Sequence, residues 1–183
     1  MKILSVNVGL PRIVEYHEEP VLTAIFKEPV EGKVSVSEFN LEGDRQADLR
    51  VHGGYSKAVY VYPSEHYEFW KNELPEMYLP FGIFGENLTS EGLRESEVFI
   101  GDRLRMGTAQ FIVTEPRQPC YKLGIRFGRT DIIKRFAQSG RSGFYLAIEK
   151  TGELESGNEI EIIEREQNIT SIADVVREKL KLK

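Results

Sequence analysis

The stretch EVFIGDRLRMGTAQFIVT, residues 97–114, carries the pattern that decides the fold. It holds two short runs rich in Val, Ile and Phe, Glu97–Ile100 and Ala109–Thr114, with a Gly101-Asp102 turn signal between them. β-Branched and aromatic residues favour strands, whereas Gly and Asp favour the tight turns that join strands. The stretch therefore predicts short β-strands connected by glycine-based turns.

The segment Gly152–Ile160 has the same order of features, with Gly157-Asn158 in the place of Gly101-Asp102. Each of the two stretches predicts an approach, a turn and a departing strand, which indicates a repeated hairpin. Further β-type runs lie at Lys2–Val8, Pro20–Phe26, Lys33–Phe39, Ala58–Tyr62, Gly143–Ile148 and Glu159–Glu164. Many short strands with turn signals predict a mainly β domain, a barrel or a sandwich, rather than an alternating α/β fold.

Three segments have helical periodicity, namely Ser64–Leu74, Asp131–Ser139 and Ser171–Leu182. The first places Tyr67 and Trp70 on one face, so we expect that face to belong to the core. The last helix follows a polar stretch after the final strand. We therefore predict a β-domain over residues 1–166 and a helical appendage over residues 167–183.

Composition narrows the function classes. The 183-residue chain has one cysteine, which excludes an intrachain disulfide and a multi-cysteine zinc site. Its three histidines, His17, His52 and His66, lack metal-binding spacing. A formal net charge of −5 argues against a general nucleic-acid partner. No stretch is long and apolar enough for a signal peptide or a membrane span, so we expect a cytoplasmic protein without a membrane partner.

The single cysteine, Cys120, lies in a proline-rich segment between Arg117 and Lys122. Nearby cations lower the pKa of a thiol and favour the reactive thiolate. In an otherwise acidic chain, the cations near Cys120 also predict a site for a small anion. The alternatives are a buried structural cysteine and a solvated basic helix face. The basic residues of this part are Arg117, Lys122, Arg126, Arg129, Lys134 and Arg135.

A second group of polar residues lies between Gly43 and Gly54. The Gly53-Gly54 pair after His52 would let the backbone approach a ligand closely and donate N–H groups to it. Asp44 and Arg45 would form an internal ion pair or serve an anionic group. The alternative is a turn that carries a surface histidine.

A third group is Gly85-Glu86-Asn87, which stands between apolar residues. Buried polar groups need partners, so these side chains would orient a ligand or lock the loop that presents Cys120. We expect the locking role for Glu86, and the ligand role stays open for Asn87. A Cys-His hydrolase that pairs Cys120 with His52 is a further alternative, but no oxyanion-hole signature accompanies it.

Taken in order, these segments resemble the MOSC domain family, named for the C-terminal part of molybdenum-cofactor sulfurases, and within it the stand-alone bacterial YiiM-like branch. The resemblance covers about Met1 to Glu164. The motifs that carry it are Gly43-Asp44-Arg45-Gln46, Val51-His52-Gly53-Gly54, Lys57-Ala58-Val59-Tyr60, Phe84-Gly85-Glu86-Asn87-Leu88, Ile100-Gly101-Asp102, Glu115-Pro116-Arg117-Gln118-Pro119-Cys120 and Ser142-Gly143-Phe144-Tyr145.

The resemblance implies a closed β-barrel of complex topology, of the pyruvate-kinase barrel type. It also implies binding of molybdenum cofactor, a molybdopterin whose metal would be held by Cys120. Soft thiolates suit molybdenum and persulfide sulfur alike. The cofactor-binding residues would be Asp44, Arg45, Gly53, Gly54, Asn87, Arg117 and Lys122.

Three functions remain open at this point. The first is an oxidoreductase that reduces a small molecule with an N–O bond, such as an N-hydroxylated base, with His52 as proton donor and an external electron-donor protein as partner. The second is a sulfur carrier that transfers a Cys120 persulfide received from a sulfur-donor protein. The third is a non-catalytic carrier of the cofactor.

Two features differ from the family pattern. YiiM-like relatives carry a C-terminal three-helix extension, whereas this sequence ends after one predicted helix. The pyridoxal phosphate of the family belongs to a sulfurase domain fused to some members, so none is expected in this chain.

Overall fold

The computed structural model describes residues 1–47, 53–165 and 170–181. Within these ranges the strands are β1 (Lys2–Val8), β2 (Arg12–Tyr16), β3 (Glu19–Thr23), β4 (Glu28–Val30), β5 (Val34–Val36), β6 (Val59–Pro63), β7 (Leu88–Glu91), β8 (Arg103–Met106), β9 (Ala109–Pro116), β10 (Phe144–Lys150), β11 (Gly152–Leu154) and β12 (Ile160–Glu164). The helices are the 3-10 turn η1 (Tyr55–Lys57), α1 (Glu65–Glu73), α2 (Tyr121–Phe127), α3 (Asp131–Ser139) and α4 (Ile172–Lys181). The mainly β fold that the sequence predicts is confirmed.

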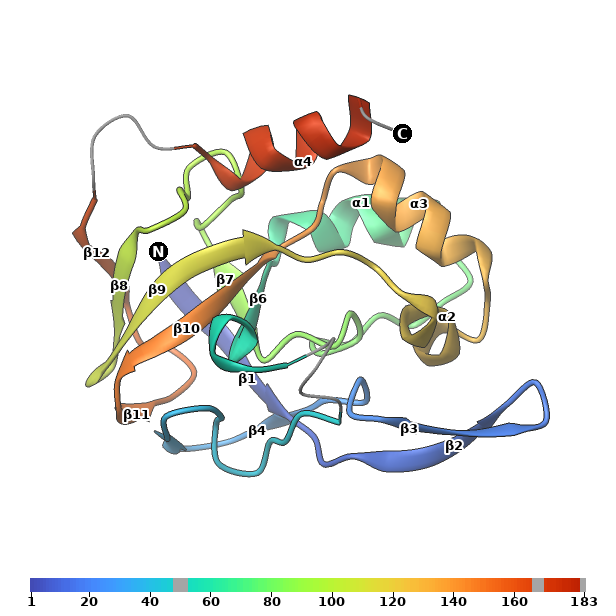
Figure 1. Ribbon diagram of the computed structural model, residues 1–183, viewed down its shortest axis with the longest axis horizontal. Coiled ribbons are helices and arrows are strands. Elements are labelled where there is room, and N and C mark those ends of the chain that lie inside the picture. The colour runs from blue at the N-terminus through green and yellow to red at the C-terminus, as the bar shows by residue number, and fades with distance from the viewer. Residues whose placement is uncertain (48–52, 166–169, 182–183) are drawn as a thin grey trace.

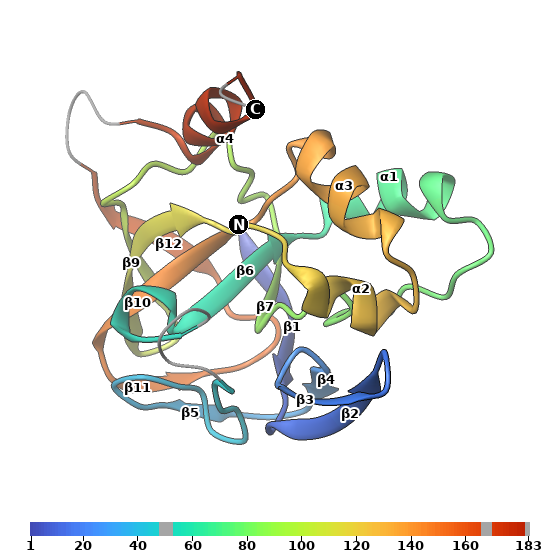
Figure 2. The same cartoon turned by 45° about the vertical axis from the view of Figure 1, so that its right-hand side comes forward.

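One large mixed sheet dominates the molecule, with the strand order β12-β8-β9-β10-β6-β7-β1-β4. Only the β6–β7 pair is parallel within it. Strands β11 and β5 form a separate pair, and β2 and β3 form a hairpin at the opposite end of the molecule. Figures 1 and 2 show α1 and α3 side by side beyond one end of the large sheet, with α2 below them.

The predicted closed barrel is not found, because no sheet of the described residues closes on itself. Strand β1 pairs with β4 through Val6–Val8, which leaves only its first residues free on that edge. Residues 157–160, which lead into β12, reach this free part through the bridge between Lys2 and Glu159 and through three backbone hydrogen bonds. Ile160 N donates to Met1 O (2.9 Å), Ile3 N donates to Asn158 O (2.9 Å), and Gly157 N donates to Ile3 O (2.8 Å). The sheet therefore curls until its two ends meet along residues 1–3, although β12 and β1 are not paired as neighbouring strands.

The repeated hairpin signal corresponds to two equivalent turns. Asp102 accepts a hydrogen bond from Phe99 N (3.0 Å), and Asn158 accepts one from Glu155 N (2.9 Å), each three residues back along the chain. In both turns the preceding glycine has a positive φ, 93° at position 101 and 90° at position 157. The departing strands, β8 and β12, pair with each other. These turns place two strands of the large sheet.

Several details of the secondary structure differ from the predictions, and strands β2, β4 and β7 were not predicted. The predicted strand Glu97–Ile100 is a turn, because Asp102 bonds back to Phe99 and ends any extended run there. Helix α2 was not predicted, and it begins directly after Cys120. By contrast, the bounds predicted for Asp131–Ser139 are those of α3, and those of the other two helices agree within one residue at each end.

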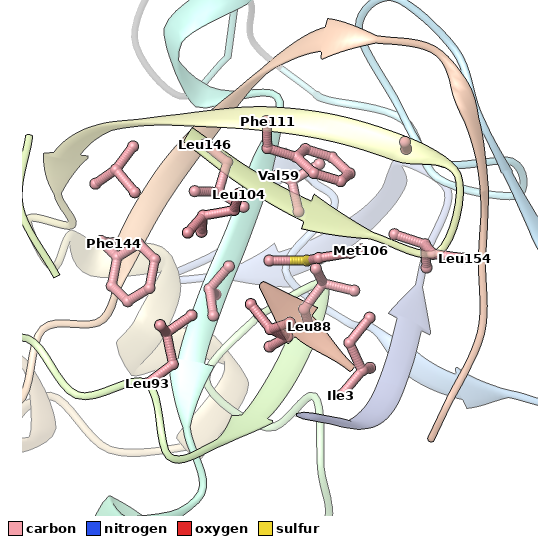
Figure 3. Close-up of a cluster of buried hydrophobic side chains, with 14 of the residues drawn as sticks. Ile3, Val59, Leu88, Leu93, Leu104, Met106, Phe111, Phe144, Leu146 and Leu154 are labelled. Carbon is pink, nitrogen blue, oxygen red and sulfur yellow. The ribbon is translucent and has the colours of Figure 1, made fainter. Parts of the chain in front are cut away.

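The buried side chains form two clusters on either side of β6. The aliphatic cluster lies inside the curled sheet. Figure 3 draws 14 of its residues and labels ten, among them Leu104, Phe111 and Leu146. The aromatic cluster lies between the sheet and helices α1, α2 and α3, and includes Trp70 and Phe84. Because side chains alternate across a strand, β6 and β10 contribute to both clusters. Ile172 and Val176 of α4 also join the aliphatic cluster.

No helix in the described ranges is long and apolar enough to cross a membrane. The division of the chain near residue 166 stays a prediction, since residues 166–169 lie outside the described ranges.

Candidate functional site

A cleft opens where the end of β9, the start of α2 and the loops after β3 and β5 meet on the tyrosine side of β6. The space between its lining residues is about 660 Å³, with the open solvent at the mouth included. Its described lining comprises Thr23, Ala24, Ile25, Lys27, Asp44, Arg45, Gln46, Ala47, Lys57, Ala58, Tyr60, Gly85, Asn87, Arg117, Gln118, Cys120, Lys122 and Tyr145. Five of these residues are basic and one is acidic. An acidic protein therefore presents a positively charged cleft.

Cys120 lies on the wall of this cleft, in the residue that precedes α2. Its backbone is extended (φ −132°, ψ 176°), and its side chain is half-buried. The charge of the thiolate raises the pKa of both neighbouring groups, Arg117 and Tyr145, although burial has the larger effect on each. The thiol is thus open to the cleft and electrostatically coupled to a guanidinium.

Arg117 is buried in the wall behind Cys120, with 6 % of its surface exposed. Its guanidinium donates a hydrogen bond to Phe84 O and lies 4.6 Å above the centre of the Tyr60 ring. The Phe136 ring lies 5.5 Å from the same guanidinium. These contacts fix the cation against the aromatic cluster and give the segment that carries Cys120 a fixed position.

Glu86 holds the loop to which Arg117 binds. The buried carboxylate accepts hydrogen bonds from Tyr67, from Gly82 N (2.8 Å) and from Phe84 N (3.1 Å). Burial raises the pKa of Glu86, and these hydrogen bonds oppose the shift. Because Phe84 O accepts the bond from Arg117, Glu86 acts on the Cys120 segment through this loop. The contacts match the locking arrangement expected for Glu86.

Asn87 and Asp44 form the floor of the cleft together with Lys27. The carboxylate of Asp44 accepts hydrogen bonds from Lys27 Nζ, from Asn87 Nδ2 (2.9 Å) and from Gly9 N (2.9 Å). Asn87 Oδ1 in turn accepts a bond from Tyr60 N, 3.1 Å away. All three side chains are buried. Asp44 pairs with Lys27, and Arg45 donates to the backbone oxygen of Asp44 instead of its carboxylate. Of the two alternatives for Asp44 and Arg45, the internal ion pair is therefore wrong, and service to an anionic group stays a prediction.

The mouth of the cleft is formed by the residues that follow Asp44. Arg45 is exposed, and its guanidinium donates to Asp44 O at 2.7 Å. Gln46 donates to Lys57 O (2.9 Å) and accepts from Gly54 N (2.8 Å). A side chain at Gly53 would collide with Gln46, because its Cβ would come within 2.3 Å of Gln46 Oε1. Glycine at position 53 thus allows a close contact with Gln46. Neither Gly53 nor Gly54 is among the described residues that line the cleft, so their approach to a ligand stays a prediction.

The structure separates the predicted basic residues into two groups. Arg117 and Lys122 line the cleft. Arg126, Arg129 and Arg135 instead form ion pairs with Glu28 (3.7 Å), Asp131 (2.7 Å) and Glu73 (3.5 Å). The solvated helix face therefore accounts for Arg129 and Arg135, but not for Arg117 and Lys122. Arg126 is largely buried, with 13 % of its side chain exposed. His52 and the rest of residues 48–52 lie outside the described ranges, so its role as proton donor stays a prediction.

Several lining residues were not recognised from the sequence as site residues, among them Lys27, Tyr60 and Tyr145. The signal for the tyrosines is strand alternation, since Tyr60 and Tyr145 occupy the face of β6 and β10 opposite the aliphatic cluster. The signal for Lys27 is a charged residue at the end of an apolar run, Ala24–Phe26. Burial of such a charge requires a partner.

Among the described residues, no group of three His, Cys, Asp or Glu side chains could hold a metal ion.

Comparison with known proteins places the chain in a family. Residues 48–161 match the MOSC domain. The chain is 42 % identical to the uncharacterized protein YflK of Bacillus subtilis over 93 % of this chain and 76 % of that protein. It is 35 % identical to a protein of Gibberella moniliformis named a reductase, over 86 % of this chain but only 28 % of that protein.

A solved structure supports the same assignment. The crystal structure of YiiM from Geobacillus stearothermophilus superimposes with a TM-score of 0.79 and 35 % identity, over 96 % of this chain and 82 % of that one. The sequence similarity to YflK and the structural superposition on YiiM each extend over nearly the whole chain. This chain belongs to the MOSC domain family, in its YiiM-like branch.

Proposed function

We propose that this protein binds molybdenum cofactor in the cleft and reduces small molecules that contain an N–O bond, with Cys120 as the protein ligand of the metal. The observation that carries the proposal is the position of Cys120. Its thiol is half-buried on the wall of a cleft with five basic residues and one acidic residue. A thiolate is a soft ligand that suits molybdenum, and cations favour the thiolate.

The residues of the cleft fit this cofactor in two further respects. The cofactor carries a terminal phosphate, and Arg45 and Lys122 at the mouth provide cations for an anionic group. The half-buried Tyr145 ring and the buried Tyr60 ring, with centres 5.3 Å apart, offer an aromatic wall to a planar group.

The comparisons support the proposal in its broad form. The MOSC domain is associated with molybdenum-cofactor binding. One relative is named a reductase, although this chain spans only 28 % of that protein. The cofactor would supply the redox chemistry. The protein's own residues would bind it, keep Cys120 in position through Arg117 and Glu86, and restrict access of water to the buried floor.

The described residues hold no group of three potential metal ligands, and the sequence has too few cysteines for an iron–sulfur cluster. We therefore propose that electrons come from an external donor protein, with a small N-hydroxylated compound as substrate. Cytoplasmic localisation belongs to the same proposal.

The test is to purify the protein from a host that makes molybdenum cofactor and to measure metal, pterin and N–O reduction. We expect stoichiometric molybdenum and pterin in the wild type, with reductase activity once an electron donor is supplied. Cys120→Ala should lose the metal and the activity. The control is Lys134→Arg, which lies on the exposed face of α3 and should behave as the wild type.

Two outcomes would contradict the proposal. Sulfur that is released by a thiol reductant, without bound metal, would make the protein a sulfur carrier. A wild-type protein that contains no metal, pterin or labile sulfur would exclude both the reductase function and the sulfur-carrier function.

A further inference from the structure

Lys27 lies on the floor of the cleft. It is almost as deeply buried as Arg117, which lies in the wall. Its side chain is 9 % exposed, and its ammonium contacts the carboxylate of Asp44, which is 2 % exposed. It lines the same cleft as Cys120. Lysine is rarely buried to this extent, because removal of a charge from water costs free energy even when a partner is present.

The backbone around Lys27 is held by close contacts with two glycines. A side chain at Gly9 would bring its Cβ within 2.3 Å of Phe26 O. A side chain at Gly82, whose φ is +85°, would bring its Cβ within 2.7 Å of Lys27 O. The Lys27 amide bonds to Ile25 O, 3.1 Å away, in a tight turn. The chain therefore fixes Lys27 from both sides and directs it to the floor of the cleft.

The Asp44 carboxylate has hydrogen-bond donors besides Lys27, because Gly9 N and Asn87 Nδ2 also donate to it. The lysine, by contrast, has Asp44 as its one ion-pair partner among the described residues. An ammonium has three N–H groups, so one contact with a carboxylate leaves donors for a molecule in the cleft.

The charges around Lys27 make its proton easier to release. Burial lowers the pKa of Lys27, and this effect exceeds the opposing attraction of Asp44 and of Glu86. Arg117, on the wall of the cleft, lowers the pKa further. These are the charged groups that face Lys27 from the loop after β5, the loop before β7 and the end of β9. A lysine with a lowered pKa is a better proton donor near neutral pH.

We propose that Lys27 is the proton donor to the leaving oxygen of the substrate, with Asp44 and Asn87 as its positioning residues. This inference rests on the proposed function, and it assigns a role to a residue that the sequence analysis did not single out. His52 is a separate candidate for the same step.

The step balances in the following way for an N-hydroxylated substrate. Two electrons, supplied through the cofactor by an external reduced flavin or iron–sulfur protein, and two protons convert the compound to the amine and water. As the N–O bond breaks, the Lys27 ammonium gives one proton to the oxygen, which leaves as water. The second proton goes to nitrogen from solvent, and solvent then returns a proton to the neutral Lys27 amine.

The test compares Lys27→Arg with Lys134→Arg. Arginine keeps the positive charge and a donor for Asp44, but it does not release its proton in the accessible pH range. We expect Lys27→Arg to retain metal and pterin and to lose about 100-fold in kcat, the size of a general-acid contribution. The alkaline decline of kcat in the wild type should disappear in this variant. His52→Gln, measured in parallel, shows whether the histidine or the lysine carries the step.

A second measurement needs no cofactor. The NMR titration of the Lys27 side chain in the cofactor-free protein should have its midpoint below that of the exposed Lys134. A midpoint equal to or above that of Lys134 overturns the role of Lys27, as does a Lys27→Arg variant with wild-type kcat. A wild type that contains cofactor but reduces no N–O substrate overturns the proposed function, and the role of Lys27 with it.

Discussion

The aliphatic cluster and the aromatic cluster differ in composition and in what lies against them. Only two of the 23 buried residues in the aliphatic cluster are aromatic, whereas seven of the 13 in the aromatic cluster are. The aliphatic cluster is enclosed by the curled sheet, as Figure 3 shows, and by α4. The aromatic cluster carries the polar residues of the cleft on its surface, including Arg117 and Glu86.

This difference shows how one domain separates stability from function. Aliphatic side chains fill the interior of the sheet without polar groups, so they serve packing alone. Aromatic rings present faces to cations and hydroxyl groups to carboxylates, so they can hold buried polar groups in fixed positions. Strands β6 and β10 connect the two, because alternate residues face opposite sides. We therefore expect substitutions in the two clusters to have different effects on the cleft.

The largest expected effect is a loss of stability in both clusters with a loss of binding in only one. Phe111→Ala in the aliphatic cluster and Phe84→Ala in the aromatic cluster each remove a fully buried ring. Each should lower the free energy of unfolding by about 3–5 kcal/mol. Only Phe84→Ala should also reduce the cofactor content. The Phe84 ring packs against Phe136, which lies beside the Arg117 guanidinium, and its loss would loosen the loop whose carbonyl accepts from Arg117.

Denaturant titration and metal analysis of both variants check this prediction. Equal loss of cofactor in Phe111→Ala and Phe84→Ala, at matched stability, would contradict the prediction. It would show that the aliphatic cluster supports cofactor binding as much as the aromatic cluster does.

A smaller effect is expected for Glu86→Gln. The new amide group would face at least one backbone N–H that Glu86 now accepts, from Gly82 or Phe84. The variant should lose about 1–3 kcal/mol of stability at neutral pH, the cost of an unsatisfied buried donor.

The pH dependence of this variant is also predicted. Because the pKa of Glu86 is raised in the folded state, the folded protein binds the proton more tightly than the unfolded chain. The wild type should therefore lose stability as pH rises from about 4.3, the unperturbed value, to the folded pKa. Glu86→Gln should lack this decline. An identical slope in both proteins, measured by urea unfolding across this range, would exclude Glu86 as its source.

The smallest effect is expected at the repeated turn. Asn158→Ala removes the side-chain bond to Glu155 N and should cost about 1 kcal/mol. Since this turn lies against the aliphatic side of the molecule, cofactor content should not change. A fall in cofactor content at this position would mean that the sheet and the cleft are coupled more tightly than the contacts indicate.

Local patterns in the sequence predict much of this fold. Strand β1 and helix α3 have the predicted bounds, because hydrophobic periodicity and a terminal glycine determine them locally. The open ends of the large sheet could not be predicted, since they depend on how β4 and β12 share one edge of β1. Such pairing between distant segments leaves no signal in a short window of sequence.

The candidate site was predicted in part for the same reason. Cys120, Arg117 and Lys122 are close in the sequence, and they line one cleft in the structure. Lys27 was missed, because its partner Asp44 lies 17 residues away and the only local signal is a charged residue after a short apolar run. One alternative for Asp44 was an ion pair with the adjacent Arg45. In the structure, its ion-pair partner is the buried Lys27.

The central claim is that the Cys120 thiolate binds the metal of the cofactor, and X-ray absorption at the molybdenum edge tests it most directly. The protein purified with its cofactor should show a sulfur neighbour of molybdenum that Cys120→Ser, with the pterin still bound, has lost. The same number of sulfur neighbours in the wild type and in Cys120→Ser would contradict the claim.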